Sequence, residues 1–185
     1  MTRTIAALAL AAVLAACGTE PPDEDTIREQ SARLTKQEPG LYRTTTTLLA
    51  YAVPNASPQD ATMARERMAS TQPEKQEICL TEKEAAKGFD PFIESLKQGK
   101  CDTRRFVANQ NELSAQITCE GTGGIVSDMD LSATSAPDRA NLVVEVEQRG
   151  DAVPGGLAQM TLDISLQRVG DCPARAGFQP ESPDG

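Results

Sequence analysis

The sequence predicts an α+β fold: a mainly antiparallel β meander of about six or seven strands, forming a curved sheet that packs on one short helix and carries two disulfides. Three observations lead to this prediction. The second half of the chain repeats short apolar–polar alternations separated by turn-like segments, a pattern typical of antiparallel strands. One earlier segment spaces its apolar residues as a helix does. The chain also contains five cysteines, behind a start that is typical of exported proteins.

The first residues are arranged as a secretory signal. Arg3 supplies a positive charge, the run Ile5–Leu14 is apolar, and two alanines precede Cys17. The apolar run is too short to span a bilayer. We therefore predict that residues 1–16 form a signal peptide.

The signal ends in a motif that indicates lipidation. Leu14–Cys17 (LAAC) resembles the lipobox of bacterial lipoproteins, and this resemblance implies a diacylglycerol on the Cys17 thiol and a third acyl chain on its amine. Two or more acyl chains give a stable membrane anchor. Gly18 stands where lipoproteins kept at the inner membrane often carry Asp, which favours the outer membrane. The alternative is ordinary cleavage after Ala16, although Leu14 then occupies a position where a small residue is preferred.

The next segment, residues 17–38, is predicted to be a lipid-anchored polar linker with a possible short helix. Its Pro-containing start is typical of a spacer. Thr26 and Glu29 are spaced as a capping box for a helix over Thr26–Lys36, and Gly40 provides a stop. Because this segment lacks a strong apolar face, we expect the helix to lie loosely on the surface.

Residues 39–175 are predicted to form a single disulfide-linked β domain, and residues 176–185 a polar tail; the chain length suits one domain. A first strand spans Leu41–Val53, which is rich in β-branched residues. The further elements expected are an exposed helix over Gln59–Ser70, a strand over Lys75–Leu80, a capped helix start over Thr81–Ala86, a hairpin of Thr103–Ala108 with Glu112–Thr118, and later strands over Ile125–Ala133, Leu142–Val146 and Met160–Leu166.

The helix that covers the sheet is also the candidate ligand site. Its apolar residues recur at helical spacing and would line a pocket beneath the curved sheet, able to hold an acyl chain or another small apolar molecule. The alternative interpretation is a packed helix–sheet core. These residues are Phe89, Phe92, Ile93 and Leu96.

Four cysteines remain once Cys17 is assigned to lipid, and four can pair in three ways. A hairpin between the two strands that Cys101 and Cys119 bracket would bring these cysteines together, which leaves Cys79 to pair with Cys172. Four reduced thiols fit poorly with an exported chain. A zinc site built from the four thiolates has no Cys-x-x-Cys pair to support it.

Composition argues against most enzyme classes and against nucleic acid as a partner. The chain has no histidine, the commonest general base and metal ligand. Its formal charge is −9, and removal of residues 1–16 makes it more negative, which repels phosphate backbones. We expect no catalytic activity and no cofactor.

The remaining candidate for chemistry is a pair of aspartates. Asp128 and Asp130 would lie on one face of a strand and are weak candidates for a metal site. Their face is opposite to that of Met129 and Leu131, so ordinary solvated aspartates are the favoured interpretation. Glu145 and Glu147 alternate with Val144 and Val146 in the same way, so they are also interpreted as solvated side chains.

Five short motifs follow one another along the chain: Pro39–Arg43 (PGLYR), Cys79–Thr81 (CLT), Lys100–Cys101, Cys119–Gly121 (CEG) and Arg168–Pro173 (RVGDCP). Together they resemble the bacterial exported family known as domain of unknown function 3617. In that family the aromatic residue after Pro-Gly-Leu is usually Trp, where this chain has Tyr. The resemblance implies a periplasmic or lipid-anchored, mostly antiparallel domain with paired cysteines. It implies no reaction, ligand or catalytic residue.

These features predict a lipoprotein of the bacterial cell envelope that acts as a non-catalytic binding or interaction module in the periplasm. Its expected partners are the membrane, through the N-terminal lipid, and an envelope protein. The alternative is a periplasmic carrier that holds a small apolar molecule or acyl chain between sheet and helix.

Overall fold

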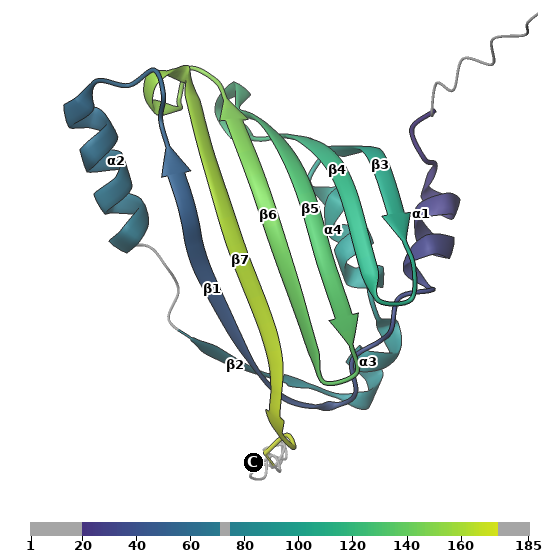
Figure 1. The fold of residues 1–185 in the computed structure, drawn as a ribbon. Helices are drawn as coiled ribbons and strands as arrows, with labels where there is room; N and C mark the ends of the chain where they lie inside the picture. The colour runs from purple at the N-terminus through teal and green to yellow at the C-terminus, as the bar shows by residue number, and fades with distance from the viewer. Residues whose placement is uncertain (1–19, 71–74, 174–185) are drawn as a thin grey trace, which may run out of the picture.

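A computed structural model describes residues 20–70 and 75–173. The predicted signal peptide, Cys17 and the polar tail lie outside the described residues. The described chain forms one seven-stranded antiparallel sheet, with the strand order β2-β1-β7-β6-β5-β4-β3 (Figure 1). This confirms the predicted fold class. The strands are β1 (Gly40–Ala52), β2 (Gln76–Leu80), β3 (Cys101–Ala108), β4 (Glu112–Glu120), β5 (Val126–Ala136), β6 (Arg139–Arg149) and β7 (Leu157–Gly170).

The sheet combines a meander with a closing strand from the start of the domain. Strands β3 to β7 follow one another as neighbours, as the alternation pattern predicts. Beyond them, β1 pairs with β7 from Leu41 opposite Gly170 to Ala52 opposite Gln159. The short strand β2 then pairs with the first part of β1 only. The first and the last of the long strands are therefore neighbours.

Four helices accompany the sheet: α1 (Glu24–Ser31), α2 (Pro58–Ser70), α3 (Glu82–Lys87) and α4 (Asp90–Gln98). In Figure 1, α4 lies behind the sheet, α1 stands beside β3, and α2 lies beyond β1. The capping box predicted at α3 is present, because Thr81 and Glu84 bond each other's backbone N–H groups. More than one helix therefore packs on the sheet, where the sequence predicted one.

Helix α1 differs most from its prediction. It begins after Asp23, whose carboxylate accepts a hydrogen bond from the Thr26 N–H, so Thr26 is a helical residue and not the cap. Its residue Ile27 and the following Leu34 are buried, which shows that the expectation of a loosely held surface helix is wrong. These two widely spaced apolar side chains dock this polar segment on the core together with polar contacts such as the hydrogen bond from the Ala108 N–H to the Gln30 side chain.

The core lies on one face of the sheet, between the strands and helices α1 and α4. Period-2 alternation places the apolar side chains of β3 to β6 on this face. A smaller cluster packs α2 against the far end of the sheet around Val53, Val153 and Ala158. The main cluster contains Ile27, Leu34, Ile93, Phe106, Ala108, Leu113, Ala115, Ile117, Leu131 and Val144.

Candidate functional site

Two disulfides fix opposite ends of the sheet. Cys101 and Cys119 face each other across the β3–β4 hairpin, with a Cα–Cα distance of 4.0 Å. Cys79 on β2 is bonded to Cys172, which follows β7, with a Cα–Cα distance of 5.3 Å. Both predicted pairings are confirmed. Because all four sulfurs are bonded in pairs, no thiolate is left among them to bind zinc.

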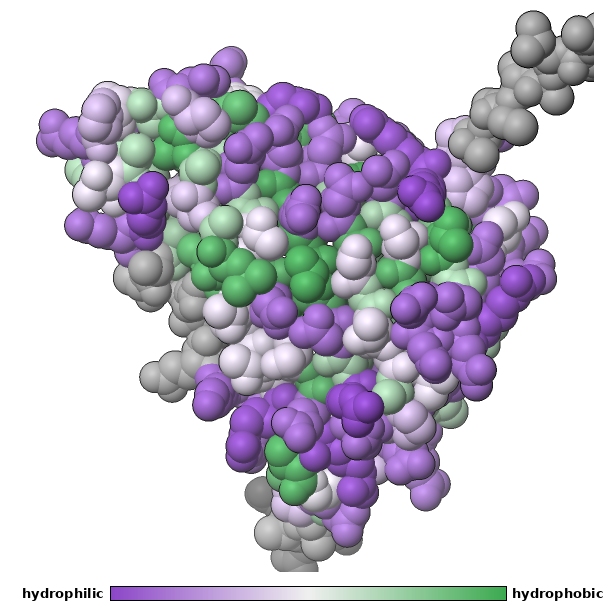
Figure 2. Space-filling view, viewed as in Figure 1, coloured by the Kyte–Doolittle hydropathy of each residue, from purple (hydrophilic) through white to green (hydrophobic). Residues whose placement is uncertain are grey.

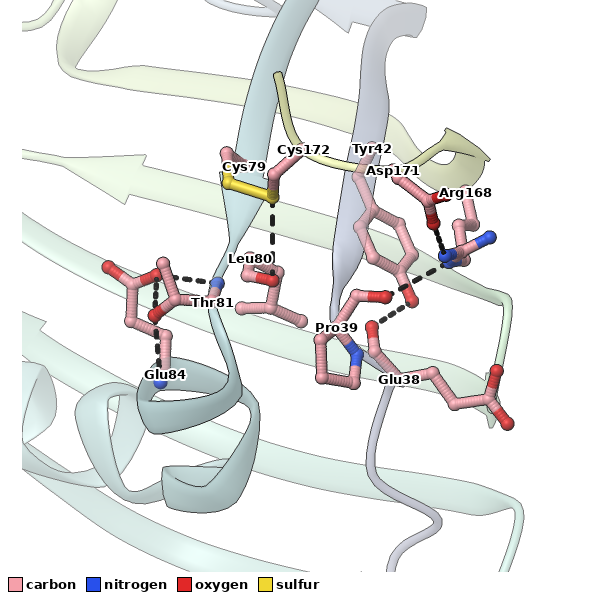
Figure 3. The surroundings of a disulfide bond; sticks show 10 residues. All are labelled: Glu38, Pro39, Tyr42, Cys79, Leu80, Thr81, Glu84, Arg168, Asp171 and Cys172. Carbon is pink, nitrogen blue, oxygen red and sulfur yellow. Dashed lines mark hydrogen bonds and ion pairs between the residues drawn. A yellow bond between two sulfur atoms is a disulfide. The ribbon is translucent and has the colours of Figure 1, made fainter. Parts of the chain in front are cut away.

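The surroundings of the Cys79–Cys172 disulfide form a structural framework (Figure 3). The Arg168 Nε donates a hydrogen bond of 3.0 Å to the Pro39 carbonyl, and the Arg168 guanidinium pairs with Asp171 at 2.6 Å. Gly40 packs so closely on this arginine that a Cβ atom would lie 2.4 Å from its Nε. A side chain at position 40 therefore has no room, which explains why glycine stands there.

Tyr42 completes this end of the sheet. Its side chain is fully enclosed, with 0% exposure, and its hydroxyl lies 2.7 Å from the Glu38 carbonyl and 2.9 Å from the Pro137 carbonyl. Burial raises the pKa of the Tyr42 hydroxyl. The aromatic residue of the Pro-Gly-Leu motif thus joins β1 to the β5–β6 turn and has a structural role.

The opposite face of the sheet is open, and the strands bring four carboxylates together on it. Asp128 pairs with Glu147 across β5 and β6, and Asp130 pairs with Glu145 two residues further along. Cross-strand partners lie about 5 Å apart, and like charges at such positions repel. The sequence placed each of these residues on a polar face, but only the register of β5 against β6 shows that they are neighbours.

Asp128 is the centre of a network of polar contacts on this face. It accepts a hydrogen bond of 2.6 Å from the Thr118 hydroxyl, pairs with Arg104 at 3.3 Å, and contacts Arg149. The Thr118 hydrogen bond, with these two arginines, lowers the pKa of the Asp128 carboxyl. Arg149 also pairs with Glu147 at 2.6 Å. Asp128 is therefore held ionised by its neighbours.

The predicted metal-site pair does not have the geometry of a metal site. Among residues 20–70 and 75–173, no three acidic or cysteine side chains converge as metal ligands would. The oxygens of Asp128 face Thr118 and two arginines, while Asp130 accepts a hydrogen bond of 2.8 Å from Gln116. The arrangement is a polar surface network bordering a groove of about 600 Å³.

Next to this network, the same face of the sheet carries several hydrophobic side chains among small polar ones. The strand register places Val107, Ser114, Ser132 and Val143 in one cross-strand row. Leu49, at an irregularity in β1, is 57% exposed, and Val107 is 50% exposed. Figure 2 shows this face, on which a hydrophobic band runs across the middle between hydrophilic regions. We call this surface the open face.

The predicted pocket helix lies at a second groove, on the other side of the sheet. Ile93 is buried in the core, while Phe89 and Phe92 pack against that core. Ile93 and Leu96 also line a groove of about 480 Å³ between α1, α4 and the start of β3. Its other apolar walls are Pro21, Pro22, Ile27 and Cys101. We call it the α1–α4 groove.

Half of this groove has almost no signal in the sequence. Pro21, Pro22 and Ile27 belong to the segment that was assigned to the linker, because its composition is polar. An ion pair of 2.7 Å between Glu24 of α1 and Lys97 of α4 joins the two helices beside the groove. The only signal for this half of the groove in the sequence is the isolated Ile27 in a polar helix.

The fold and its framework define a small antiparallel β-sheet domain joined by two disulfides. Residues 37–172 match the sequence model of a family described as "Protein of unknown function (DUF3617)", so the chain belongs to this family. No curated protein and no solved structure matches the chain. None of the described helices is long and apolar enough to cross a membrane.

Proposed function

We propose that this protein is a lipid-anchored, non-enzymatic binding module of the bacterial cell envelope, held at the periplasmic side of the outer membrane through Cys17. One observation carries the proposal: the four other cysteines of the chain bond one another, which leaves Cys17 as the one cysteine without an internal partner among them. Two internal disulfides are typical of an oxidising compartment. The LAAC motif supplies a reason for the fifth cysteine.

Metabolic labelling tests the anchor. Cells that express the protein are fed an alkyne analogue of palmitate, and the purified protein is examined by gel fluorescence and intact mass. We expect label and the mass of an acylated Cys17, and neither in the Cys17→Ser variant. Density-gradient separation should place the protein with the outer membrane and move Gly18→Asp towards the inner membrane. An unacylated protein of full mature mass would overturn the proposal.

The open face is the surface we propose for the partner. Exposed Leu49 on β1 and exposed Val107 on β3 lie towards its two sides, with a charged network between them, and exposed apolar groups rimmed by polar groups are typical of protein interaction sites. The basis for a non-enzymatic role is that Asp128, Asp130 and Glu147 are engaged by arginines and amides and that the chain has no histidine.

Photocross-linking in cells tests this surface. A photoreactive phenylalanine analogue is placed at Val107 or at Leu49, and at the exposed Glu94 of α4 as a matched control. We expect one adduct of defined mass from the first two positions, identified by mass spectrometry and abolished by Val143→Asp. Equal labelling from Glu94 would show that the open face is not the site.

A second candidate function, a carrier of an apolar molecule, is favoured by the α1–α4 groove. Its volume of about 480 Å³ falls within the usual range for small-molecule sites, and six of its lining residues are apolar.

A further inference from the structure

The position of the α1–α4 groove relative to the N-terminus suggests an occupant. The described chain begins at Glu20, and the next two residues, Pro21 and Pro22, line the groove. Cys17 is three residues before Glu20. Three residues span at most about 10–11 Å, so any group on Cys17 is held close to the groove.

The groove is suited to an alkyl chain. Among its lining residues, Ile27 and Ile93 are buried, and Leu96 and Pro22 are half-buried. An alkyl chain needs no hydrogen-bond partners, so an apolar lining of this kind keeps its methylenes out of water as a bilayer does. Polar groups stand at the rim, where Glu24 and Lys97 pair with each other.

We propose that the α1–α4 groove holds one of the acyl chains attached to Cys17. This inference rests on the proposed lipidation and deepens it. A triacylated cysteine has one chain more than a stable membrane anchor requires, since two chains are sufficient. The remaining chain lies between α1 and α4, so this corner of the domain is held against the membrane and the open face stays accessible to a partner.

An acyl chain that carries a photoreactive group tests the proposal directly. Cells are fed a diazirine fatty acid, which is incorporated into the lipid on Cys17; membranes are irradiated, and cross-linked peptides are mapped. We expect cross-links within the same chain, to the peptides that contain Pro21–Ile27 and Ile93–Cys101. The same spectra report whether Cys17 carries an acyl chain at all.

Matched leucine variants sharpen this test. Leu96→Lys places a charge in the groove and should lower the intramolecular cross-link by about tenfold. Leu49→Lys, on the open face, should leave it unchanged. Thermal melts of both variants show whether each is folded. The cross-link map of the wild-type protein tests the proposal even if a variant does not fold.

The outcomes separate the two proposals. Acylated Cys17 with cross-links only to phospholipid would contradict the proposed occupant of the groove and leave the proposed lipid anchor standing. Cross-links spread equally over the open face and the groove would also overturn it. A protein without acylation would overturn the anchor itself, and the groove occupant with it.

Discussion

Tyr42 is the residue whose single hydroxyl joins three parts of the chain. Replacing it with phenylalanine removes the hydrogen bond to the Glu38 carbonyl, while the Pro137 carbonyl keeps its bond from the Glu38 N–H. A neutral hydrogen bond contributes about 0.5–1.5 kcal/mol to net stability, so we expect Tyr42→Phe to lower the free energy of unfolding by this amount. Urea denaturation at neutral pH measures it.

The raised pKa of Tyr42 adds a pH dependence. The unfolded chain loses the phenolic proton near pH 10, while the folded protein retains it. The stabilising contribution of the neutral hydroxyl is therefore complete below pH 10 and is lost as the pH rises towards the folded-state pKa. Wild type should lose stability above about pH 10 more steeply than Tyr42→Phe. Parallel slopes in the two proteins would contradict this role.

Asp128 has the opposite dependence. The pKa of the Asp128 carboxyl is lowered in the folded protein. Its contribution to the stability of the fold is therefore complete above the ordinary carboxyl pKa of about 4, and it is lost as the pH falls through the folded-state pKa. Asp128→Asn should be less stable at pH 7 and should lose less stability on acidification. Thermal melts from pH 7 to pH 2.5 check this, with Asp151→Asn, in an exposed turn, as the control.

At the scale of elements, α1 protects the edge of the sheet. The Gln30 side chain accepts a hydrogen bond of 3.1 Å from the Ala108 N–H of β3, and Ile27 is buried against the core. Covering an edge strand in this way prevents pairing with other chains. Ile27→Ala should lower stability by about 2–5 kcal/mol and speed hydrogen exchange in β3. The exposed Glu29→Ala is the control; equal exchange in both variants would contradict the docking of α1.

The elements that the sequence predicts well are those with a local signal. Alternation identifies β4 to β7, and the Thr81–Glu84 spacing identifies the start of α3. The docking of α1 has no such signal, because it depends on a tertiary contact of one isoleucine. The pairing of β1 with β7 joins strands that are far apart in the sequence. The contact between Asp130 and Glu145 depends on the register of β5 against β6. Composition determines neither of them. The α1–α4 groove was therefore only half predicted.

At the scale of the whole molecule, the two disulfides differ in the length of chain they close. Cys79 and Cys172 are 93 residues apart, whereas Cys101 and Cys119 are 18 apart. Loop-closure entropy predicts stabilisation of about 4–5 kcal/mol for the longer loop and about 3 kcal/mol for the shorter one. Denaturation of the two double alanine variants should show this order. A larger loss on removing Cys101 and Cys119 would contradict it.

The pairing of β1 with β7 also sets the order in which the chain can fold. Leu41 pairs with Gly170 and Ala52 pairs with Gln159, so the β1–β7 ladder forms only when the last strand has been made. Contacts between such distant segments form slowly, because a long loop must close first. Under the export that we propose, a chain that stays open until its last strand has been made would suit passage through a narrow channel before it becomes compact.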